Sequence, residues 1–404
     1  MKNSISITRQ NGLKNLLLFK DKEVIKVITG VRRCGKSTLL EQFKNHLLEN
    51  GTKESQIVYI NFEDYENRLL LETDSFYAYI KASIIENKRM YLLFDEIQQV
   101  RDFQKVVDSF YIKKNIDIYL TGSNSNLLSG ELATLLTGRY VEIKMQPFSI
   151  REFMEAAKIT SRQEAYRKYI ETSSFPYTVQ LLENPDAVKI YLEGVYNSII
   201  VKDILNRKKI NDIKILTSIT QFVFDNIGLE LSSKRIADTL TSNGRKIDSR
   251  TVENYISALT DTFIVYKAER YNIKGKEYLK SLEKYYICDL GLRNALLGKK
   301  AMDTGHILEN IVYLELVRRG YAVYVGKIDS LEVDFVAQNE DGNLYIQVAA
   351  SVRDETTLQR ELKPLMAIRD SYKKIILTLD DDPEADYNGI KRMNAVDWLL
   401  EDGK

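Results

Sequence analysis

The chain has 404 residues, of which 44% are hydrophobic and 28% charged, and its formal net charge is +1. This length suffices for two or three domains with hydrophobic cores, and the balanced charge excludes nucleic-acid binding driven by overall charge. Two cysteines and two histidines exclude a disulfide framework and a structural zinc cluster. With no apolar signal core and no apolar run of transmembrane length, we expect a cytoplasmic protein without a membrane partner.

Short apolar runs alternate with amphipathic stretches in the first third of the chain. The alternation predicts a mostly parallel sheet with helices on both faces, in a first domain of residues 1–148. Beyond Pro147 the pattern is helical, which predicts a lid over residues 149–227. The expected strands cover residues 24–28, 57–62, 90–94, 116–121 and 140–145.

The remaining sequence predicts two further domains. In residues 228–300, helices at 233–240 and 249–260 are followed by an extended segment, which is the spacing of a winged helix-turn-helix. Residues 301–404 predict a small α/β domain in which a helix, three strands, a helix and a strand follow one another.

A glycine-rich loop of spacing G-x-x-x-x-G-K-S lies between an expected strand and an expected helix. Backbone N–H groups of such a loop surround phosphate oxygens, Lys36 can reach the β- and γ-phosphates, and the Ser37 hydroxyl can ligate Mg²⁺. The sequence therefore predicts a P-loop ATPase that uses ATP and Mg²⁺. The residues expected to bind nucleotide are Gly30, Arg33, Cys34, Gly35, Lys36, Ser37 and Thr38.

Two carboxylates follow a buried strand, and a polar turn follows the next strand of the site. We expect Asp95 to hold Mg²⁺ together with Ser37, and Glu96 to polarise the attacking water. In the turn, Asn124 is favoured, and Ser123 nearly as much, to contact the γ-phosphate or the water. An ordinary polar turn is the alternative.

Arg139 follows an expected helix over residues 126–137. In ring ATPases that position faces the nucleotide of the neighbouring subunit, where a guanidinium stabilises transition-state charge; a solvated or salt-bridged arginine is the alternative. The catalytic candidates are thus Lys36, Glu96, Asn124 and Arg139. The expected fold class is α/β, with an AAA+-like P-loop sheet, a helical lid, a winged helix-turn-helix and a small α/β domain.

The motifs resemble those of the AAA+-type prokaryotic ATPases that carry a C-terminal domain of unknown function. The similarity covers nearly the whole chain and implies this architecture rather than a specific activity. It rests on I-T-G-V-R-R-C-G-K-S at 28–37, F-D-E at 94–96, T-G-S-N at 121–124, L-T-G-R-Y at 136–140 and E-V-D-F at 332–335.

The last expected domain resembles the PD-(D/E)XK nuclease core through its element order and through Glu309 and Asp334. A working site of this type needs an acidic residue at the position of Gln347 and usually a lysine at that of Ala349, to bind a divalent metal and orient water. Because neither is present, we expect an inactive, nuclease-derived binding or oligomerisation domain. Alternatively, a lysine supplied from elsewhere in the chain could complete the nuclease site.

Residues 231–300 contain 14 lysines and arginines and 8 acidic residues, a local net charge of +6. The leading hypothesis is a homo-oligomeric ATPase, with a hexamer-type ring favoured, that acts on DNA as a remodeller or motor in repair or recombination. One alternative is an ATP-gated switch or defence-type sensor that controls a protein partner. A metal-dependent nuclease with an ATPase regulator is the other.

Overall fold

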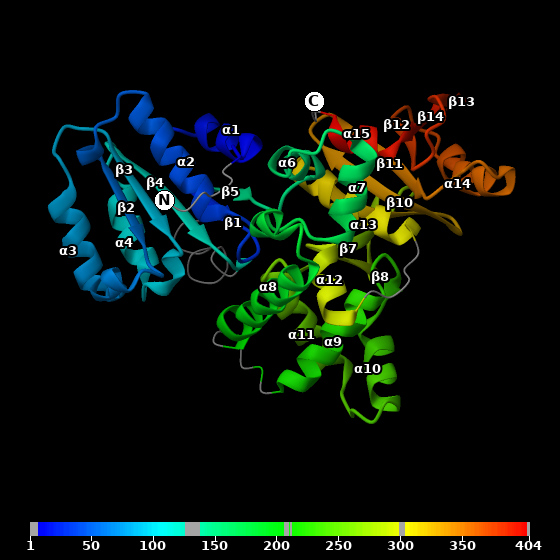
Figure 1. Cartoon of the computed structure of the whole chain (residues 1–404), viewed down its shortest axis with the longest axis horizontal. Helices are drawn as coiled ribbons and strands as arrows, with labels where there is room; N and C mark the ends of the chain where they lie inside the picture. Colours follow the sequence, from blue (N-terminus) through cyan, green and yellow to red (C-terminus); the bar gives the residue numbers. More distant parts are fainter. Residues whose placement is uncertain (1–6, 126–137, 206–209, 211, 299–303, 402–404) are drawn as a thin grey trace. The chain divides into compact units, whose positions relative to one another are not determined.

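The computed structural model describes residues 7–125, 138–205, 210, 212–298 and 304–401 (Figure 1). The chain divides into two compact units, one of Met1–Pro147 with Asp261–Phe263, and one of Phe148–Thr260 with Ile264–Lys404. One sheet lies in the first unit, and a second, larger sheet lies in the second.

The sheet of the first unit has five parallel strands in the order β2-β3-β4-β1-β5. Each bound expected from the sequence lies within one residue of the observed one, and the predicted parallel α/β fold is confirmed. β4 separates β1 from β3, so side chains at the end of β4 lie between those of the other two. The strands are β1 (Ile25–Thr29), β2 (Ile57–Asn61), β3 (Met90–Asp95), β4 (Ile116–Gly122) and β5 (Tyr140–Lys144).

Helices cover both faces of this sheet (Figure 1). On one face, α3 (Thr73–Ser83) and α4 (Phe103–Tyr111) join a core with alternate residues of the strands. On the other face lies α2 (Lys36–Glu49), whose Phe43 ring lies 4.4 Å from that of Tyr119 on β4. α1 (Gln10–Leu18) packs against α2.

The second unit begins with helices, as the pattern after Pro147 predicts. Several of them start at a polar side chain that accepts an N–H of the first turn, which is why they begin where they do; Ser149 and Ser161 are two such caps. The helices before residue 300 are α6 (Ile150–Ala156), α7 (Arg162–Glu171), α8 (Pro185–Ser198), α9 (Ile213–Asp225), α10 (Ser233–Ser242), α11 (Ser249–Asp261) and α12 (Leu290–Leu297). Two shorter helical segments are the 3₁₀ turn Pro176–Leu181 and the π-helical Ile199–Leu205.

The sheet of the second unit has nine strands in the order β13-β14-β12-β11-β10-β9-β7-β8-β6. Its strands are β6 (Glu230–Leu231), β7 (Val265–Asn272), β8 (Glu277–Ile287), β9 (Ala322–Ile328), β10 (Leu331–Asn339), β11 (Gly342–Ala349), β12 (Lys373–Thr378), β13 (Ala385–Tyr387) and β14 (Ile390–Asn394). Its later helices are α13 (Thr304–Arg318), α14 (Glu355–Ala367) and α15 (Ala395–Leu400).

One sheet thus spans the boundary expected at residue 300. The hairpin β7–β8 precedes that boundary and β9 follows it, yet β7 pairs in parallel with β9, Tyr271 opposite Gly326. A pairing between strands so distant in the chain leaves no local pattern, which is why a separate last domain was expected. The order α13-β9-β10-β11-α14-β12 agrees with the predicted order of elements.

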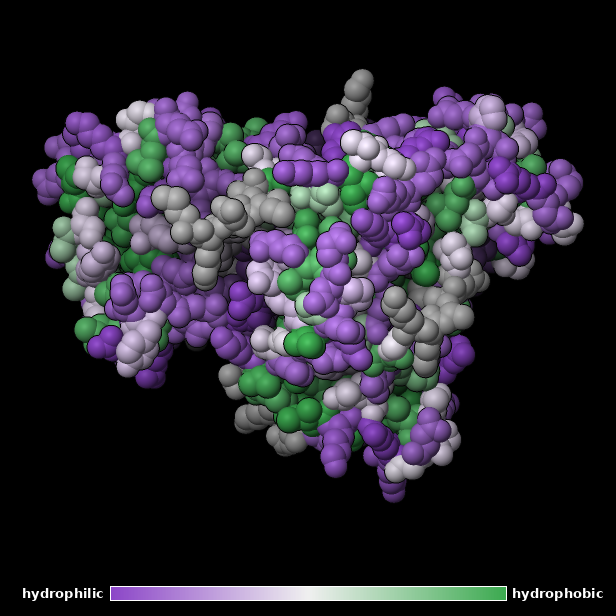
Figure 2. Space-filling model, in the orientation of Figure 1, coloured by the Kyte–Doolittle hydropathy of each residue, from purple (hydrophilic) through white to green (hydrophobic). Residues whose placement is uncertain are grey.

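In the described part of the chain, no helix is long and apolar enough to cross a bilayer. Hydrophilic residues predominate on the face seen in Figure 2. Large exposed apolar side chains, such as Leu18, Ile112 and Ile190, belong to different elements. Apolar side chains scattered in this way are normal on a protein surface.

Candidate functional site

The phosphate loop joins β1 to α2 at the carboxyl edge of the five-stranded sheet. Gly30 has φ +151°, and a Cβ there would lie 2.0 Å from the carbonyl oxygen of Met145, so only glycine fits. Gly35 caps α2 in a left-handed conformation. The loop N–H groups and the positive end of α2 therefore meet at one place, which is the arrangement that binds phosphate.

Lys36 points back into this loop. Its Nζ donates to the carbonyl oxygens of Gly30 at 3.0 Å and Val31 at 3.3 Å, and lies 3.7 Å from Glu96 Oε1. The side chain is almost wholly buried. The ammonium is thus held by weak neutral acceptors and one carboxylate, inside the loop where phosphate oxygens would bind.

Asp95 ends β3 and Glu96 follows it, and Thr121 of β4 contacts both residues. The Thr121 hydroxyl donates to Asp95 Oδ1 at 2.5 Å and accepts the Glu96 N–H at 2.9 Å. Burial raises the pKa of Asp95, while hydrogen bonds from Thr121 and Ser37 oppose the increase. Asp95 Oδ2 is buried without a hydrogen-bond partner, so a magnesium ion next to Ser37 would fit this oxygen.

Glu96 adopts a left-handed conformation, φ +55°, that non-glycine residues rarely take. The amide of Gln98 donates to Glu96 Oε2. Such strain persists where the surroundings hold a side chain in a required position. The sequence motif points to Glu96 but gives no sign of Gln98, because a glutamine in a turn has no motif of its own.

Ser123 and Asn124 follow β4 at the same edge of the sheet, and both are buried. Register places Gly122 opposite Thr29, directly before the phosphate loop. The turn is therefore beside the loop, as either candidate role requires.

Arg139 is at the other edge. It precedes β5, whose Tyr140 lies opposite Ile25 at the start of β1, so the length of β1, about 16 Å at roughly 3.3 Å per residue, separates it from the loop. Its guanidinium pairs with Asp108 at 2.5 Å and lies over the Tyr111 ring. Arg139 does not join the site of its own chain. The helix expected over residues 126–137 lies outside the described residues.

The remaining loop residues differ in exposure. Arg33 and Thr38 are exposed, whereas Cys34 is buried and burial raises the pKa of its thiol. Arg9, which the sequence motifs did not reveal, is buried against the loop and donates to the carbonyl oxygens of Cys34 at 2.8 Å and Gln146 at 2.7 Å. A single arginine so far from the motif carries no sequence signal, although it supports the loop.

A second group of polar residues lies in the nine-stranded sheet. Glu309 and Asp334, expected there from the nuclease resemblance, are brought together, and Lys284 of β8 lies between them. Gln347 does not join them through its side chain, since its Oε1 accepts the Asp334 N–H and its Nε2 donates to Glu361.

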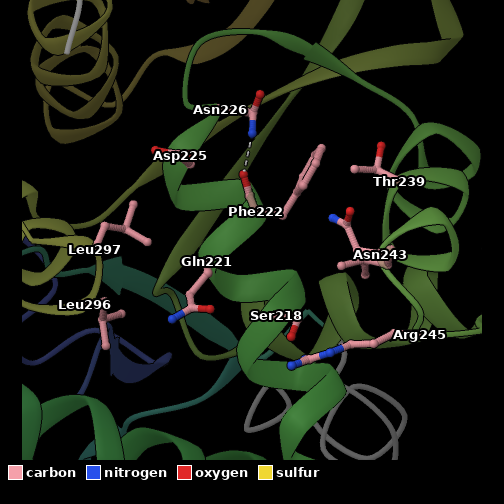
Figure 3. A pocket seen from close by; sticks show the side chains of 11 residues that line it. Ser218, Gln221, Phe222, Asp225, Asn226, Thr239, Asn243, Arg245, Leu296 and Leu297 are labelled. Carbon is pink, nitrogen blue, oxygen red and sulfur yellow. Dashed lines mark hydrogen bonds between the residues drawn. The ribbon is translucent and has the colours of Figure 1, made fainter. Parts of the chain in front are cut away.

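A pocket of about 620 Å³ lies in the second unit between α9, α10 and α12 (Figure 3). Asp225 is the last residue of α9 and Asn226 follows it, whereas Asn243 and Arg245 follow α10. The Asn226 amide donates to the Phe222 carbonyl oxygen. None of its lining residues belongs to the phosphate loop.

A parallel sheet with a phosphate loop, two carboxylates on the strand beyond β4, and helices on both faces defines a P-loop ATPase of the AAA type. A family model described as an AAA domain matches residues 22–154. A second model, described as a domain of unknown function, matches residues 163–303.

Comparisons with individual proteins show relatives of the chain over most of its length. An uncharacterized protein of Haemophilus influenzae is 42% identical over 400 residues, 98% of this chain and 99% of that protein. The uncharacterized protein MJ1544 of Methanocaldococcus jannaschii is 30% identical over 370 residues, 88% of this chain and 79% of that protein. This chain belongs to the same family of AAA-domain proteins as these relatives.

The Walker-type ATPase PABY2304 of Pyrococcus abyssi is a similar solved structure. It matches with a TM-score of 0.50 and 16% identity, over 71% of this chain and 95% of that one. At this identity the match shows a shared fold.

Proposed function

We propose that this protein binds ATP with Mg²⁺ at residues 30–37 and hydrolyses it. The observation that carries the proposal is that Thr121 holds the carboxylate of Asp95 and the backbone N–H of Glu96, beside the buried Lys36 at the N-terminus of α2. Ser37 Oγ and Asp95 Oδ2 would hold the magnesium ion, which when bound neutralises phosphate charge.

In this mechanism Lys36 exchanges one set of acceptors for another. Its ammonium leaves the carbonyl oxygens of Gly30 and Val31 and donates to the β- and γ-phosphate oxygens, which are stronger, charged acceptors. Glu96 Oε1 then loses its ion pair with Lys36 and can accept a proton from the attacking water. The Gln98 amide and the Thr121 hydroxyl keep Glu96 oriented meanwhile.

Two variants test the assignment. Lys36→Ala removes the phosphate-binding ammonium, so nucleotide affinity should fall at least tenfold in a titration with a fluorescent ATP analogue. Glu96→Gln keeps the shape but not the base, so affinity should stay within threefold while kcat falls by roughly 10²–10⁴. An equal loss of affinity in both variants would show that Glu96 serves binding rather than hydrolysis.

We further propose that the protein acts on DNA. The support is a group of exposed basic residues on α10, on α11 and between them, which we call the basic face: Lys234, Arg235, Arg245, Lys246 and Arg250. One side of α11 is buried, Val252, Ile256 and Leu259 included, so its opposite side is available for phosphate contacts.

The basic face is smaller than the net charge of +6 suggests. Lys267 pairs with Glu269 and Glu283, and Arg270 pairs with Glu230. Lys284 is buried among carboxylates. These three residues of the β7–β8 hairpin are therefore less available to DNA than those of the basic face.

A ring-forming oligomer is the third part of the proposal. Arg139 lies at the edge of the sheet away from its own loop and is about half exposed, which suits a role at a neighbour's nucleotide. Mass photometry with and without ATP tests assembly. A strictly monomeric protein with full ATPase activity would contradict a role for Arg139 in trans.

A second candidate function is a nucleotide-controlled switch for a protein partner. It is favoured by one observation: β7 lies between β8 and β9 inside the sheet, so the β7–β8 hairpin is not a free wing. Slow hydrolysis that DNA does not stimulate, with capture of one protein partner only in the ATP-bound state, would support this function over the first.

A further inference from the structure

Lys284 of β8 is a buried lysine surrounded by acidic side chains. Its Nζ lies 3.0 Å from Glu309 Oε1, 2.8 Å from Glu332 Oε1 and 3.9 Å from Asp334 Oδ1. Its side chain is 6% exposed. The three acids, here called the carboxylate cluster, come from α13 and β10, whereas the lysine comes from the strand before the boundary expected at residue 300.

The nuclease resemblance of this region implies a divalent metal ion held by Glu309 and Asp334. We propose instead that the Lys284 ammonium takes the position of that ion. The carboxylate cluster is then an ionic clamp that joins β8 to α13 and β10, and it is not a metal-dependent nuclease centre.

One carboxylate oxygen of Glu309 and one of Asp334 already accept hydrogen bonds. Glu309 Oε1 accepts from the Tyr286 hydroxyl at 2.6 Å as well as from Lys284. Asp334 Oδ2 accepts the Val348 N–H at 2.8 Å. A hard divalent ion requires several free oxygens at roughly 2.0–2.6 Å, and Gln347 points to Glu361 and contributes none.

The charges agree with this assignment. Burial alone would lower the pKa of Lys284, but the attraction of the neighbouring acids, Glu309 first, outweighs it and raises that pKa.

Glu309 and Glu332 face one ammonium. An added divalent ion would be repelled by that ammonium at close range. Within the described residues, no group of three histidine, cysteine or acidic side chains has the geometry to hold a metal ion.

The unmodified protein provides the first test. Nucleotide-free protein is titrated with Mn²⁺ by calorimetry, beside Asp334→Asn, which leaves the phosphate loop unchanged. We expect the two titrations to be the same, because the cluster binds no metal. Mn²⁺ binding that Asp334→Asn abolishes, or Mn²⁺-dependent DNA cleavage that it abolishes, would overturn the proposal.

Lys284→Met provides the second test, because it removes the ammonium and leaves the acids. We expect its melting temperature to fall by on the order of 10 °C and Mn²⁺ to restore part of the loss, since the ion can then enter. The matched control is Lys267→Met on β7, whose lysine pairs with Glu269 and Glu283 at a partly exposed position; it should change little. A Lys284→Met protein as stable as the unmodified one would overturn the proposal.

If Lys284→Met does not fold, the double variant Lys284→Met/Glu309→Gln tests whether the defect comes from the charge or from the shape of Lys284. It removes one positive and one negative charge together, so we expect it to fold and to give no response to Mn²⁺. Failure of the second substitution to restore folding would contradict the clamp, because the defect would then lie in the shape of Lys284 rather than in its charge.

Discussion

The hydroxyl of Thr121 on β4 donates a 2.5 Å hydrogen bond to Asp95 at the end of β3. The same oxygen accepts the N–H of Glu96. The contact depends on strand order, since β4 lies between β1, which carries the phosphate loop, and β3. Thr121, to which the sequence analysis assigned no role of its own, therefore holds the Asp95 carboxylate and the backbone of Glu96.

Thr121→Val should lower kcat for ATP hydrolysis by roughly 10–100-fold, the usual effect of losing a residue that orients a ligand. Valine keeps the shape but removes the hydroxyl, so nucleotide affinity should change less than threefold. Thr121→Ser keeps the hydroxyl and should retain most of the activity. Steady-state kinetics with an affinity titration separates the two effects, and equal losses in valine and serine variants would contradict the role of the hydroxyl.

The basic face predicts salt-dependent DNA binding. Lys246→Glu/Arg250→Glu should lower affinity for duplex DNA at least tenfold and reduce the slope of log affinity against log salt by about 2. The matched control, Lys168→Glu/Lys189→Glu, makes the same change in net charge on α7 and α8. Fluorescence anisotropy at several salt concentrations measures both, and equal weakening by the two pairs would indicate attraction by net charge alone.

Asp289 should be a major contributor to stability. It is buried directly before α12. Its carboxylate accepts hydrogen bonds from the N–H groups of Leu292 and Ser174 and from the hydroxyls of Ser173 and Ser174. Asp289→Ala leaves these donors unsatisfied and should lower the free energy of unfolding by about 3 kcal/mol or more.

The exposed cap of α14 supplies the comparison for Asp289. Asp354 accepts from Thr357 in the same way, but water can replace it, so Asp354→Ala should cost only about 1 kcal/mol. Chemical denaturation measures both variants. Similar losses would mean that burial does not decide the contribution of Asp289.

Asp334 predicts a pH dependence of stability. Its pKa is raised from 3.8 to about 8 by burial and by Glu309, so between these values the folded protein holds a proton that the unfolded chain has lost. The stabilising contribution is therefore complete below pH 4 and is lost as the pH rises through 8. It changes by at most about 1.4 kcal/mol per pH unit.

We expect the melting temperature to fall from pH 6 to pH 9, and to fall less steeply in Asp334→Asn. The pKa of Glu309 is lowered, so Glu309 titrates in acid, outside the range from pH 6 to pH 9. Thermal unfolding at constant ionic strength measures the two slopes. Parallel slopes would show that Asp334 does not hold the proton.

The strands and the phosphate loop of the first unit could be predicted because short, continuous stretches of sequence specify them. Apolar runs set the strands, the G-x-x-x-x-G-K-S spacing set the loop, and Asp95 and Glu96 stand at the end of a buried run. Arg9 and Gln98 were not predictable, since their contacts join parts of the chain without a shared motif.

The second unit was less predictable because its contacts are distant in sequence. The helices and strands were found from their periodicity, but the β7–β9 pairing leaves no local pattern. For the same reason no lysine was expected beside Glu309 and Asp334, although Lys284 of β8 lies there. Counting charges overestimated the basic surface, since a count does not distinguish Lys284, which is buried, from Lys246, which is exposed.

The β7–β9 pairing also determines how this chain can be cut for experiments. A fragment that stops at residue 300 loses β9 and turns β7 into an edge with unpaired N–H and C=O groups, which is a template for aggregation. The same fragment leaves Lys284 buried without Glu309 and Asp334. The segments on either side of residue 300 should therefore melt in a single calorimetric transition, and neither is a sound choice for expression alone.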